Sequence, residues 1–268
     1  MNRVRRLGLL GFLAAASLLL GCSNLAPALD PQVRQTLAPT GKLRVGVYSG
    51  SPTSMVTDPE TGERVGVALD LGRALARQLD VPFEPVEFRR VAEILDALKV
   101  GAIDFTFTNA TEERARIVDF TAPLIALELG YLVPAGSAIQ SLAEIDQPGR
   151  RIGVSQGSSS QGKLTKAYKN ATVVPVPSLK VAAEMLSSRQ LDAFATNKGI
   201  LFETADGLPG ARILEGHWDL EHLAMPIPKA RDPGRGSVHR FPAQVPSSGW
   251  PAALVQTAGS ARAAAPPG

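Results

Sequence analysis

Short strands and helices alternate along this chain, and the alternation occurs twice. Lys42 to Tyr48 alternates in polarity and is rich in β-branched side chains, which predicts a strand. From Val67 onward, leucines at positions 69, 71, 75 and 79 follow helical spacing. A chain of alternating strands and helices folds as a largely parallel sheet that helices cover on both faces. The order of elements therefore predicts an α/β protein.

The two halves show the same order of elements. The first half continues with Glu84–Phe88 (strand), Val91–Lys99 (helix) and Ala102–Phe107 (strand). The second half has Arg150–Val154 (strand), Ser159–Tyr168 (helix), Val173–Val176 (strand), Ser178–Ser187 (helix) and Leu191–Ala195 (strand). Extended stretches at Leu127–Gly136 and His222–Pro228 connect the halves. This predicts two hinged lobes with a ligand crevice at the carboxyl ends of the strands. A single continuous sheet is the alternative that the pattern leaves open.

The chain begins with features of an export signal. Arg3, Arg5 and Arg6 precede an apolar run, Leu7 to Leu20, that is too short to span a membrane comfortably. We therefore expect residues 1–21 to be a signal peptide and the mature protein to act outside the cytoplasm.

The end of that apolar run carries a more specific motif. Leu19-Leu20-Gly21-Cys22 resembles the lipobox of bacterial lipoproteins, which implies cleavage before Cys22 and lipid attachment to it. Cys22 is the only cysteine in the chain, so no internal disulfide can form. An ordinary cleaved signal with a chance cysteine is the alternative.

The net charge of the mature chain argues against a polyanionic partner. The whole sequence has 28 basic and 25 acidic residues, and three of the arginines lie in residues 1–21, which contain no acid. The remaining chain has 25 residues of each sign, so we expect no binding to nucleic acid.

Several motifs occur in the order found in one family. The segment Gly66-Val-Ala-Leu-Asp-Leu-Gly-Arg-Ala-Leu-Ala76 resembles a signature of family 3 extracytoplasmic solute-binding proteins, the amino-acid receptors of ABC importers. Gly101-Ala-Ile-Asp104, Thr111-Glu-Glu-Arg114, Val118-Asp-Phe-Thr-Ala-Pro123, Ile152-Gly-Val-Ser-Gln-Gly-Ser158 and Gln190-Leu-Asp-Ala193 are similar to later motifs of the same family. The resemblance implies a type II periplasmic binding protein-like fold, in which each lobe is a mainly parallel sheet flanked by helices and two hinge crossings join the lobes.

Arg114 is the strongest candidate for binding the ligand. A planar guanidinium can hold a carboxylate with two parallel hydrogen bonds. Arg114 lies in the first turn of a helix that Asn109 or Thr111 would cap, where free backbone N–H groups favour anions. In the family the matching arginine binds the α-carboxylate, with hydroxyl or amide groups just upstream, here Thr108 and Asn109. The alternative is that Arg114, like Arg116, is an exposed helix cation.

A second anion site is expected at the turn that follows the first strand of the second half. Gly157, Ser158 and Ser159 lie between a strand and a helix, where N–H groups and hydroxyls converge. In the family this turn supplies the second lobe's contacts to the same carboxylate. The alternative is a plain helix N-cap.

The amino end of the ligand is less well specified. Asn197 stands where amino-acid receptors of the family usually carry the aspartate that pairs with the α-ammonium, and an amide brings no charge. Glu203 or another acid would then have to substitute, or the ligand is not a standard α-amino acid. For Glu203 itself, a place on a solvated helix face is the favoured alternative. Ser51 lies in a loop where many members place an aromatic residue that stacks on the ligand. Tyr48 ends the first strand, where stacking on the ligand and packing are equally open.

No catalytic residue, metal site or cofactor is expected. His217, His222 and His239 lack ligand-like spacing. Gly157-Ser-Ser-Ser-Gln161 lacks the Gly-x-Ser-x-Gly pattern of a nucleophile elbow.

These inferences together predict a substrate-binding receptor of an ABC importer that binds a small carboxylate-bearing solute, a polar amino acid, between two closing lobes. Its partners would be that ligand, an inner-membrane ABC permease and a bacterial membrane reached through lipid on Cys22, on the periplasmic or extracytoplasmic face, with the protein a monomer. The alternative is a dehydratase-type enzyme (cyclohexadienyl or arogenate dehydratase-like) on the same scaffold, and a sensory subunit is a third option.

The same inferences divide the chain into five parts. These are residues 1–21 (signal peptide), 22–41 (lipid-anchored linker), 42–130 (lobe 1), 131–221 (lobe 2), and 222–268 (return to lobe 1 and C-terminal tail).

Overall fold

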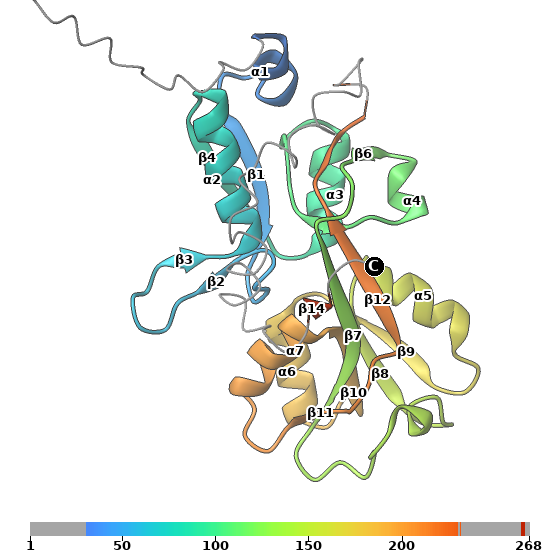
Figure 1. Ribbon diagram of the computed structural model, residues 1–268. Helices are drawn as coiled ribbons and strands as arrows, with labels where there is room; N and C mark the ends of the chain where they lie inside the picture. Colours follow the sequence, from blue (N-terminus) through green and yellow to red (C-terminus); the bar gives the residue numbers. More distant parts are fainter. Residues whose placement is uncertain (1–30, 230, 232–263, 266–268) are drawn as a thin grey trace, which may run out of the picture.

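A computed structural model describes residues 31–229, 231 and 264–265. Cys22, the predicted signal peptide and most of the predicted C-terminal tail lie outside these residues. The described chain forms two lobes, joined by two long strands that run side by side between them (Figure 1). We use lobe 1 for the part that holds helices α1 to α4 and lobe 2 for the part that holds α5 to α7.

Lobe 1 is built around one pair of parallel strands. Strand β1 (Leu43–Tyr48) pairs in parallel with β4 (Phe83–Phe88). Helix α2 (Val67–Leu79) buries its leucines against one hydrophobic cluster, and α3 (Val91–Lys99) packs in a second. The smaller elements of this lobe are α1 (Pro31–Leu37), β2 (Val56–Thr57), β3 (Arg64–Val65), β5 (Thr108–Asn109), α4 (Glu112–Ala115), β6 (Val118–Phe120) and β13 (Pro226–Pro228).

Lobe 2 is a sheet with helices on both faces. Strands β8 (Arg151–Ser155), β9 (Thr172–Val176) and β10 (Ala193–Asn197) are mutually parallel. Helix α5 (Ser159–Ala167) covers one face, and α6 (Leu179–Ser187) and α7 (Lys198–Asp206) cover the other. The 3-10 helix η1 (Leu142–Glu144) and strand β11 (Arg212–Ile213) complete the lobe.

The two crossings extend the lobe 2 sheet into lobe 1. Strands β7 (Ile125–Val133) and β12 (Asp219–Ala224) pair antiparallel along most of their length. β7 also pairs with β10, and β12 pairs with β5, which gives the strand order β5-β12-β7-β10-β8-β9. A further short strand, β14 (Ala264–Ala265), pairs with β7. The expected hinged α/β fold with two crossings is confirmed, and β1–β4 forms a separate sheet.

Most predicted elements occur within one or two residues of their expected bounds, but the strand at Ala102–Phe107 is wrong. Only Phe105 forms a bridge there, parallel to Val45, and β5 begins later, at Thr108. The chain instead turns at Gly101 (φ +69°) so that the carboxylate of Asp104 reaches the start of β1. Residues 103–105 are buried on all sides, and a buried turn cannot be told from a buried strand by periodicity.

The first pair of parallel strands in each lobe, together with the helix and strand that follow it, has matching positions in the two lobes. We call this set of matching positions the repeated frame. The two parallel pairs have the same register, with Arg44 opposite Glu84 and Tyr48 opposite Phe88 in lobe 1. Arg151 lies opposite Thr172 and Ser155 opposite Val176 in lobe 2. Beyond these strands, the two segments of the chain align position by position, without a gap, through the next helix and strand. The corresponding pairs are Arg90 and Ser178, Gly101 and Arg189, Asp104 and Asp192, Thr108 and Thr196, and Asn109 and Asn197.

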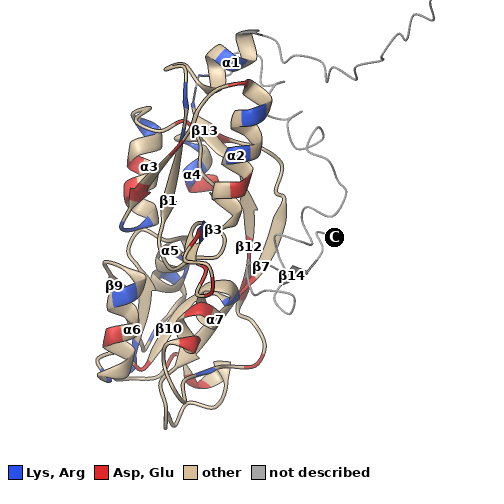
Figure 2. Ribbon diagram, turned by 90° about the vertical axis from the view of Figure 1, so that its left-hand side faces the viewer, with Lys and Arg blue, Asp and Glu red and all other residues tan. Residues whose placement is uncertain are grey.

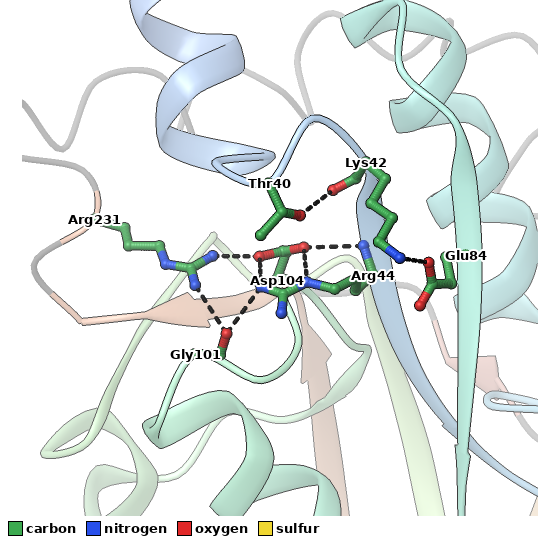
Figure 3. A network of polar contacts seen from close by, with 7 residues as sticks. All are labelled: Thr40, Lys42, Arg44, Glu84, Gly101, Asp104 and Arg231. Carbon is green, nitrogen blue, oxygen red and sulfur yellow. Dashed lines mark hydrogen bonds and ion pairs between the residues drawn. The ribbon is translucent and has the colours of Figure 1, made fainter.

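One part of the frame is an arginine–aspartate clamp. In lobe 1, Asp104 Oδ2 accepts from the backbone N and from Nε of Arg44 at 3.0 and 2.9 Å, and Nη2 of Arg44 donates to Gly101 O at 2.8 Å (Figure 3). Arg231 donates to the same carboxylate from beyond β13, and the Asp104 side chain is fully buried. Burial opposes ionisation of Asp104, but the hydrogen bonds from Arg44 and Arg231 outweigh it and lower its pKa.

Lobe 2 repeats the clamp at its surface. Asp192 Oδ2 accepts from the backbone N and Nε of Arg151 at 2.7 and 3.1 Å, and Nη2 of Arg151 donates to Arg189 O at 2.7 Å. Here the arginine side chain is 44% exposed.

Over the helices of both lobes, basic and acidic residues are interspersed (Figure 2).

Candidate functional site

Arg114 points into the protein from the short helix α4. Thr111 is the N-cap of this helix, because its Oγ1 accepts a hydrogen bond from the Arg114 backbone N at 3.2 Å. Of the two caps expected from the sequence, Thr111 is therefore correct and Asn109 is not. The Arg114 residue is only 7% exposed, whereas Arg116 is exposed. The alternative of an exposed helix cation applies to Arg116 alone.

The hydrogen-bond partners of the Arg114 guanidinium are neutral. Nη1 donates to Thr108 Oγ1 at 2.9 Å and to Asn109 O at 3.1 Å, and Nη2 donates to Gly157 O at 3.4 Å. Within the described residues it forms no ion pair with a carboxylate. Burial lowers the pKa of Arg114, against the opposing effect of the nearby Glu221 carboxylate. A buried cation with neutral partners is a favourable place for an anionic ligand.

The turn of residues 157–159 brings lobe 2 against lobe 1. Ser158 caps α5, with its Oγ accepting from Gln161 N at 3.2 Å, and it also lines the cavity between the lobes. Ser159 Oγ instead accepts from Asn109 Nδ2 at 3.0 Å. Gly157 has φ +75°, and a Cβ there would lie 2.4 Å from Cβ of Ala92 in α3. The two lobes therefore touch directly at this turn.

Asn197 and Glu221 form the opposite side of the site. Asn197 Oδ1 caps α7 by accepting from Ile200 N at 3.1 Å, and its Nδ2 donates to Glu221 Oε2 at 2.9 Å. Ser159 Oγ donates to the other oxygen of Glu221 at 3.4 Å. Burial raises the pKa of Glu221, although the Asn197 hydrogen bond and the Arg114 charge oppose that effect.

Glu221 is the acid that the sequence analysis missed. Glu203 is exposed on α7 and does not line the cavity, so the alternative of a solvated helix face is correct for it and it does not supply the missing carboxylate. Its position in the sequence was a signal, because Glu221 directly precedes the crossing predicted at His222. A strand that crosses between the lobes passes beside the expected ligand crevice.

Tyr48 and Ser51 lie at different depths. Tyr48 lines the cavity and packs against apolar clusters of both lobes, and burial raises the pKa of its phenol to about 12. Ser51 is fully buried and its Oγ hydrogen-bonds Thr53 Oγ1 at 3.0 Å. Ser51 does not line the cavity.

These residues surround a small cavity between the lobes. Its volume is about 30 Å³. Its lining residues include Tyr48, Arg89, Arg90, Thr108, Arg114, Ser158, Ser159, Ser178, Leu179, Asn197 and Glu221. That volume suits a water molecule, whereas sites for small-molecule ligands measure about 300–1,000 Å³. The contacts of Arg114 with Gly157 and of Asn109 with Ser159 thus hold a closed arrangement, which a larger ligand would have to open.

Within the described ranges, no three His, Cys, Asp or Glu side chains group so as to hold a metal ion. His217 pairs with Glu128 at 3.4 Å, His222 is exposed, and His239 lies outside the described residues. Nor does any helix in that part of the chain combine the length and apolar character needed to cross a membrane.

Comparison with known proteins gives consistent matches. The family model described as bacterial extracellular solute-binding proteins, family 3, matches residues 43–257. A glutamine-binding protein of Geobacillus stearothermophilus is 28% identical over 180 residues, which is 65% of this chain and 68% of that protein. The ABC transporter glutamine-binding protein GlnH of Bacillus subtilis (strain 168) is 28% identical over 170 residues, which is 62% of each protein. The chain thus spans about two thirds of the length of these relatives.

Solved structures share the fold. A crystal structure of the ancestral amino acid-binding protein AncCDT-1, a precursor of cyclohexadienyl dehydratase, superposes with a TM-score of 0.71 at 24% identity. The superposition covers 83% of this chain and 97% of the other. Amino acid-binding proteins from other sources superpose comparably.

Proposed function

This chain belongs to family 3 of the bacterial extracellular solute-binding proteins, and from that membership we propose that it is the substrate-binding receptor of an ABC importer. The family expected from the sequence motifs is thereby confirmed. Its ligand is a small carboxylate-bearing solute, a polar amino acid, held between the two lobes. An ABC permease is the partner that receives the ligand.

The observation that carries this proposal is the placement of Arg114 and Glu221 around one cavity. The two groups interact electrostatically, yet they form no direct ion pair and are held by neutral neighbours. A free α-amino acid carries one negative and one positive group. Such a ligand complements the pair, with its carboxylate on Arg114 and its ammonium on Glu221.

Closure of the lobes follows from the same contacts. In the closed arrangement, Gly157 O of lobe 2 accepts a hydrogen bond from the Arg114 guanidinium of lobe 1. A ligand carboxylate on Arg114 takes the place of that weak 3.4 Å contact and faces the turn of residues 157–159. The ligand thereby joins the two lobes, which favours the closed form by differential binding.

A thermal-shift screen of the mature chain against the twenty amino acids and small organic acids tests the proposal. A ligand at 100 times its dissociation constant adds about 2.7 kcal/mol to the free energy of unfolding. We expect at least one amino acid to raise the melting temperature in a concentration-dependent manner. The absence of any shift with all twenty amino acids would contradict the receptor assignment.

A dehydratase-type enzyme is the second candidate, and Glu221 is the observation that favours it. Removing a leaving group from a cyclohexadienyl acid needs a carboxylic acid that stays protonated, and burial raises the pKa of Glu221 in the cavity. A turnover assay with prephenate and arogenate separates the candidates. Product formation that Glu221→Gln abolishes would establish the enzyme, whereas binding without turnover supports the receptor, which is not an enzyme.

The location outside the cytoplasm follows from the family, and the attachment to the membrane is part of the proposal. As a member of an extracellular family, the chain acts outside the cytoplasm. We further propose that it is a monomer, anchored to the membrane by lipid on Cys22, with lobe boundaries after residues 130 and 221. Cys22→Ser should release the protein into the soluble fraction. Membrane association without lipid labelling would contradict the anchor.

A further inference from the structure

The two helices that begin beside the cavity have different first residues. Helix α6 starts after Ser178, whose Oγ accepts a hydrogen bond from Val181 N at 3.2 Å. Helix α3 starts after Arg90, whose side chain makes no capping hydrogen bond. Arg90 and Ser178 occupy corresponding places in the repeated frame, and both line the cavity. The fold itself is thus compatible with serine at this position.

Arginine is an unfavourable residue for a helix N-cap. It has no acceptor for the first backbone N–H groups, and its charge faces the positive end of the helix dipole. Serine at such a position stabilises the start of a helix. Departures from local preference are expected where a residue serves function. Arginine in place of serine at position 90 therefore indicates a functional role for its side chain.

The Arg90 side chain is only partly satisfied. Its Nη2 lies 3.3 Å from Glu93 Oε1, and the other oxygen of Glu93 accepts from the Arg89 backbone N at 3.1 Å. Its Nε is buried and has no hydrogen-bond partner among the described residues. Buried donors in proteins are nearly always paired, so this atom lacks the acceptor that such a donor normally has.

The charges of the cavity lining indicate what that acceptor is. The lining contains Arg89, Arg90 and Arg114 but a single acid, Glu221. The carboxylate and ammonium of an amino acid are matched by Arg114 and Glu221. Arg89 is exposed and screened by solvent, which leaves Arg90, whose side chain is 27% exposed, as the additional partly buried cation. A cationic ligand side chain would be repelled there, and an anionic one attracted.

Resting on the proposed function, we propose that the site selects an amino acid whose side chain ends in a carboxylate, and that Arg90 binds that carboxylate. The two relatives described above bear the name of glutamine, whose side-chain amide is neutral. Specificity for a dicarboxylic amino acid would set this chain apart from them.

Calorimetric titration of the mature chain with L-glutamate, L-aspartate, L-glutamine and L-arginine tests this assignment. Because a charge-assisted hydrogen bond separates the acidic ligands from glutamine, we expect glutamate or aspartate to bind at least about tenfold more tightly. Arginine should bind most weakly. Arg90→Ser should lower the affinity for the acidic ligand by about tenfold or more while leaving glutamine within about twofold.

Two controls keep the result interpretable. Arg90→Ser installs the cap found at Ser178, so its melting temperature should equal or exceed that of the wild type. Arg116→Ser removes an exposed arginine of the same lobe and should leave the order of affinities unchanged.

The outcomes separate this inference from the proposed function. If wild type binds glutamine or arginine as tightly as glutamate and aspartate, the side-chain preference is wrong while the receptor assignment stands. If Arg90→Ser lowers the affinities for glutamate and glutamine equally, or neither of them, Arg90 does not read the side chain. If wild type binds no amino acid, the proposed function itself fails.

Discussion

The two lobes carry the same frame of arginine, aspartate and asparagine, but they complete it differently. In lobe 2 the Arg151–Asp192 clamp lies at the surface, and Asn197 leads directly into α7. In lobe 1 the equivalent Asp104 is buried and also binds Arg231, and Asn109 is followed by the inward-pointing Arg114. The repeated frame is common to the fold of both lobes. The differences lie in lobe 1, where Arg231 anchors the chain beyond β13 to Asp104 and Arg114 brings a positive charge into the cavity.

The largest expected effect is the difference between the two clamps. Asp104→Asn leaves two largely buried guanidiniums without a carboxylate, and breaking a buried pair in this way costs about 3–5 kcal/mol. Asp192→Asn breaks the matching pair at the surface, in which the side chains of Arg151 and Asp192 are 44% and 23% exposed, and we expect a loss of about 1 kcal/mol. Urea unfolding of both variants measures the difference. Equal losses of unfolding free energy would contradict the view that burial distinguishes the clamps.

The second comparison is between Arg114, which lies in helix α4, and Arg116, which caps the end of this helix. Arg114→Ala removes the buried cation and should weaken ligand binding by at least about 1.5–3 kcal/mol, the range for a charge-assisted hydrogen bond. Arg116→Ala removes an exposed cation and should have little effect. Calorimetry with the ligand found in the screen compares them, provided that circular dichroism shows both variants folded. Equal affinity in wild type and Arg114→Ala would remove the central residue of the site.

Glu221 predicts how ligand binding depends on pH. An ammonium binds the ionised carboxylate, so the complex holds fewer protons at Glu221 than the free protein does. Because burial raises the pKa of Glu221 in the free protein, affinity should fall as pH decreases through that raised value, above the ordinary range for glutamate. Glu221→Gln should lose about tenfold in affinity and become insensitive to pH over the same interval.

Stability should respond to Glu221 with the opposite sign. The folded protein holds this proton more tightly than the unfolded chain. The stabilising contribution is therefore present at pH values below the ordinary glutamate pKa and is lost as pH rises through the raised value. If wild-type affinity has the same pH profile as Glu221→Gln, the ammonium lies elsewhere.

The smallest expected effect concerns closure at the turn of residues 157–159. Gly157→Ala forces a side chain into positive φ and against Ala92 of the other lobe. Gly149→Ala imposes the same backbone strain, at φ +78°, but in open space. Both variants should lose about 1–2 kcal/mol of stability, and Gly157→Ala alone should bind ligand severalfold more weakly. Equal affinities for ligand in the two alanine variants would show that this contact does not matter for closure.

The sequence predicted the repeated elements because each one obeys its own periodicity. Helices α2, α3 and α6 carry regular apolar faces, and their predicted bounds agree with the structure to within one or two residues. Helix α5 buries only Ser160 and Leu164, and its start was predicted from the serines that follow the strand. The turn before β5 did not follow this rule, since Asp104 is held by long-range partners and not by local pattern.

The site was predictable on the side where motifs are contiguous. Thr108, Asn109 and Arg114 lie within one short segment, and the structure places them together. Glu221 was missed because its proximity to Asn197 depends on how β12 crosses between the lobes. Arg90 was missed although it carried a signal, a cation immediately before a helix where Ser, Thr, Asp or Asn is preferred.

A crystal structure of the mature chain, grown with a saturating amino acid found in the screen, tests the central claim most directly. We predict that a ligand carboxylate oxygen lies within hydrogen-bond distance of the Arg114 guanidinium and that the ligand ammonium lies beside the Glu221 carboxylate. The ligand should contact both lobes, with the 157–159 turn facing its carboxylate. A ligand bound outside the cavity, or one whose ammonium is held by a carboxylate other than Glu221, would contradict the account.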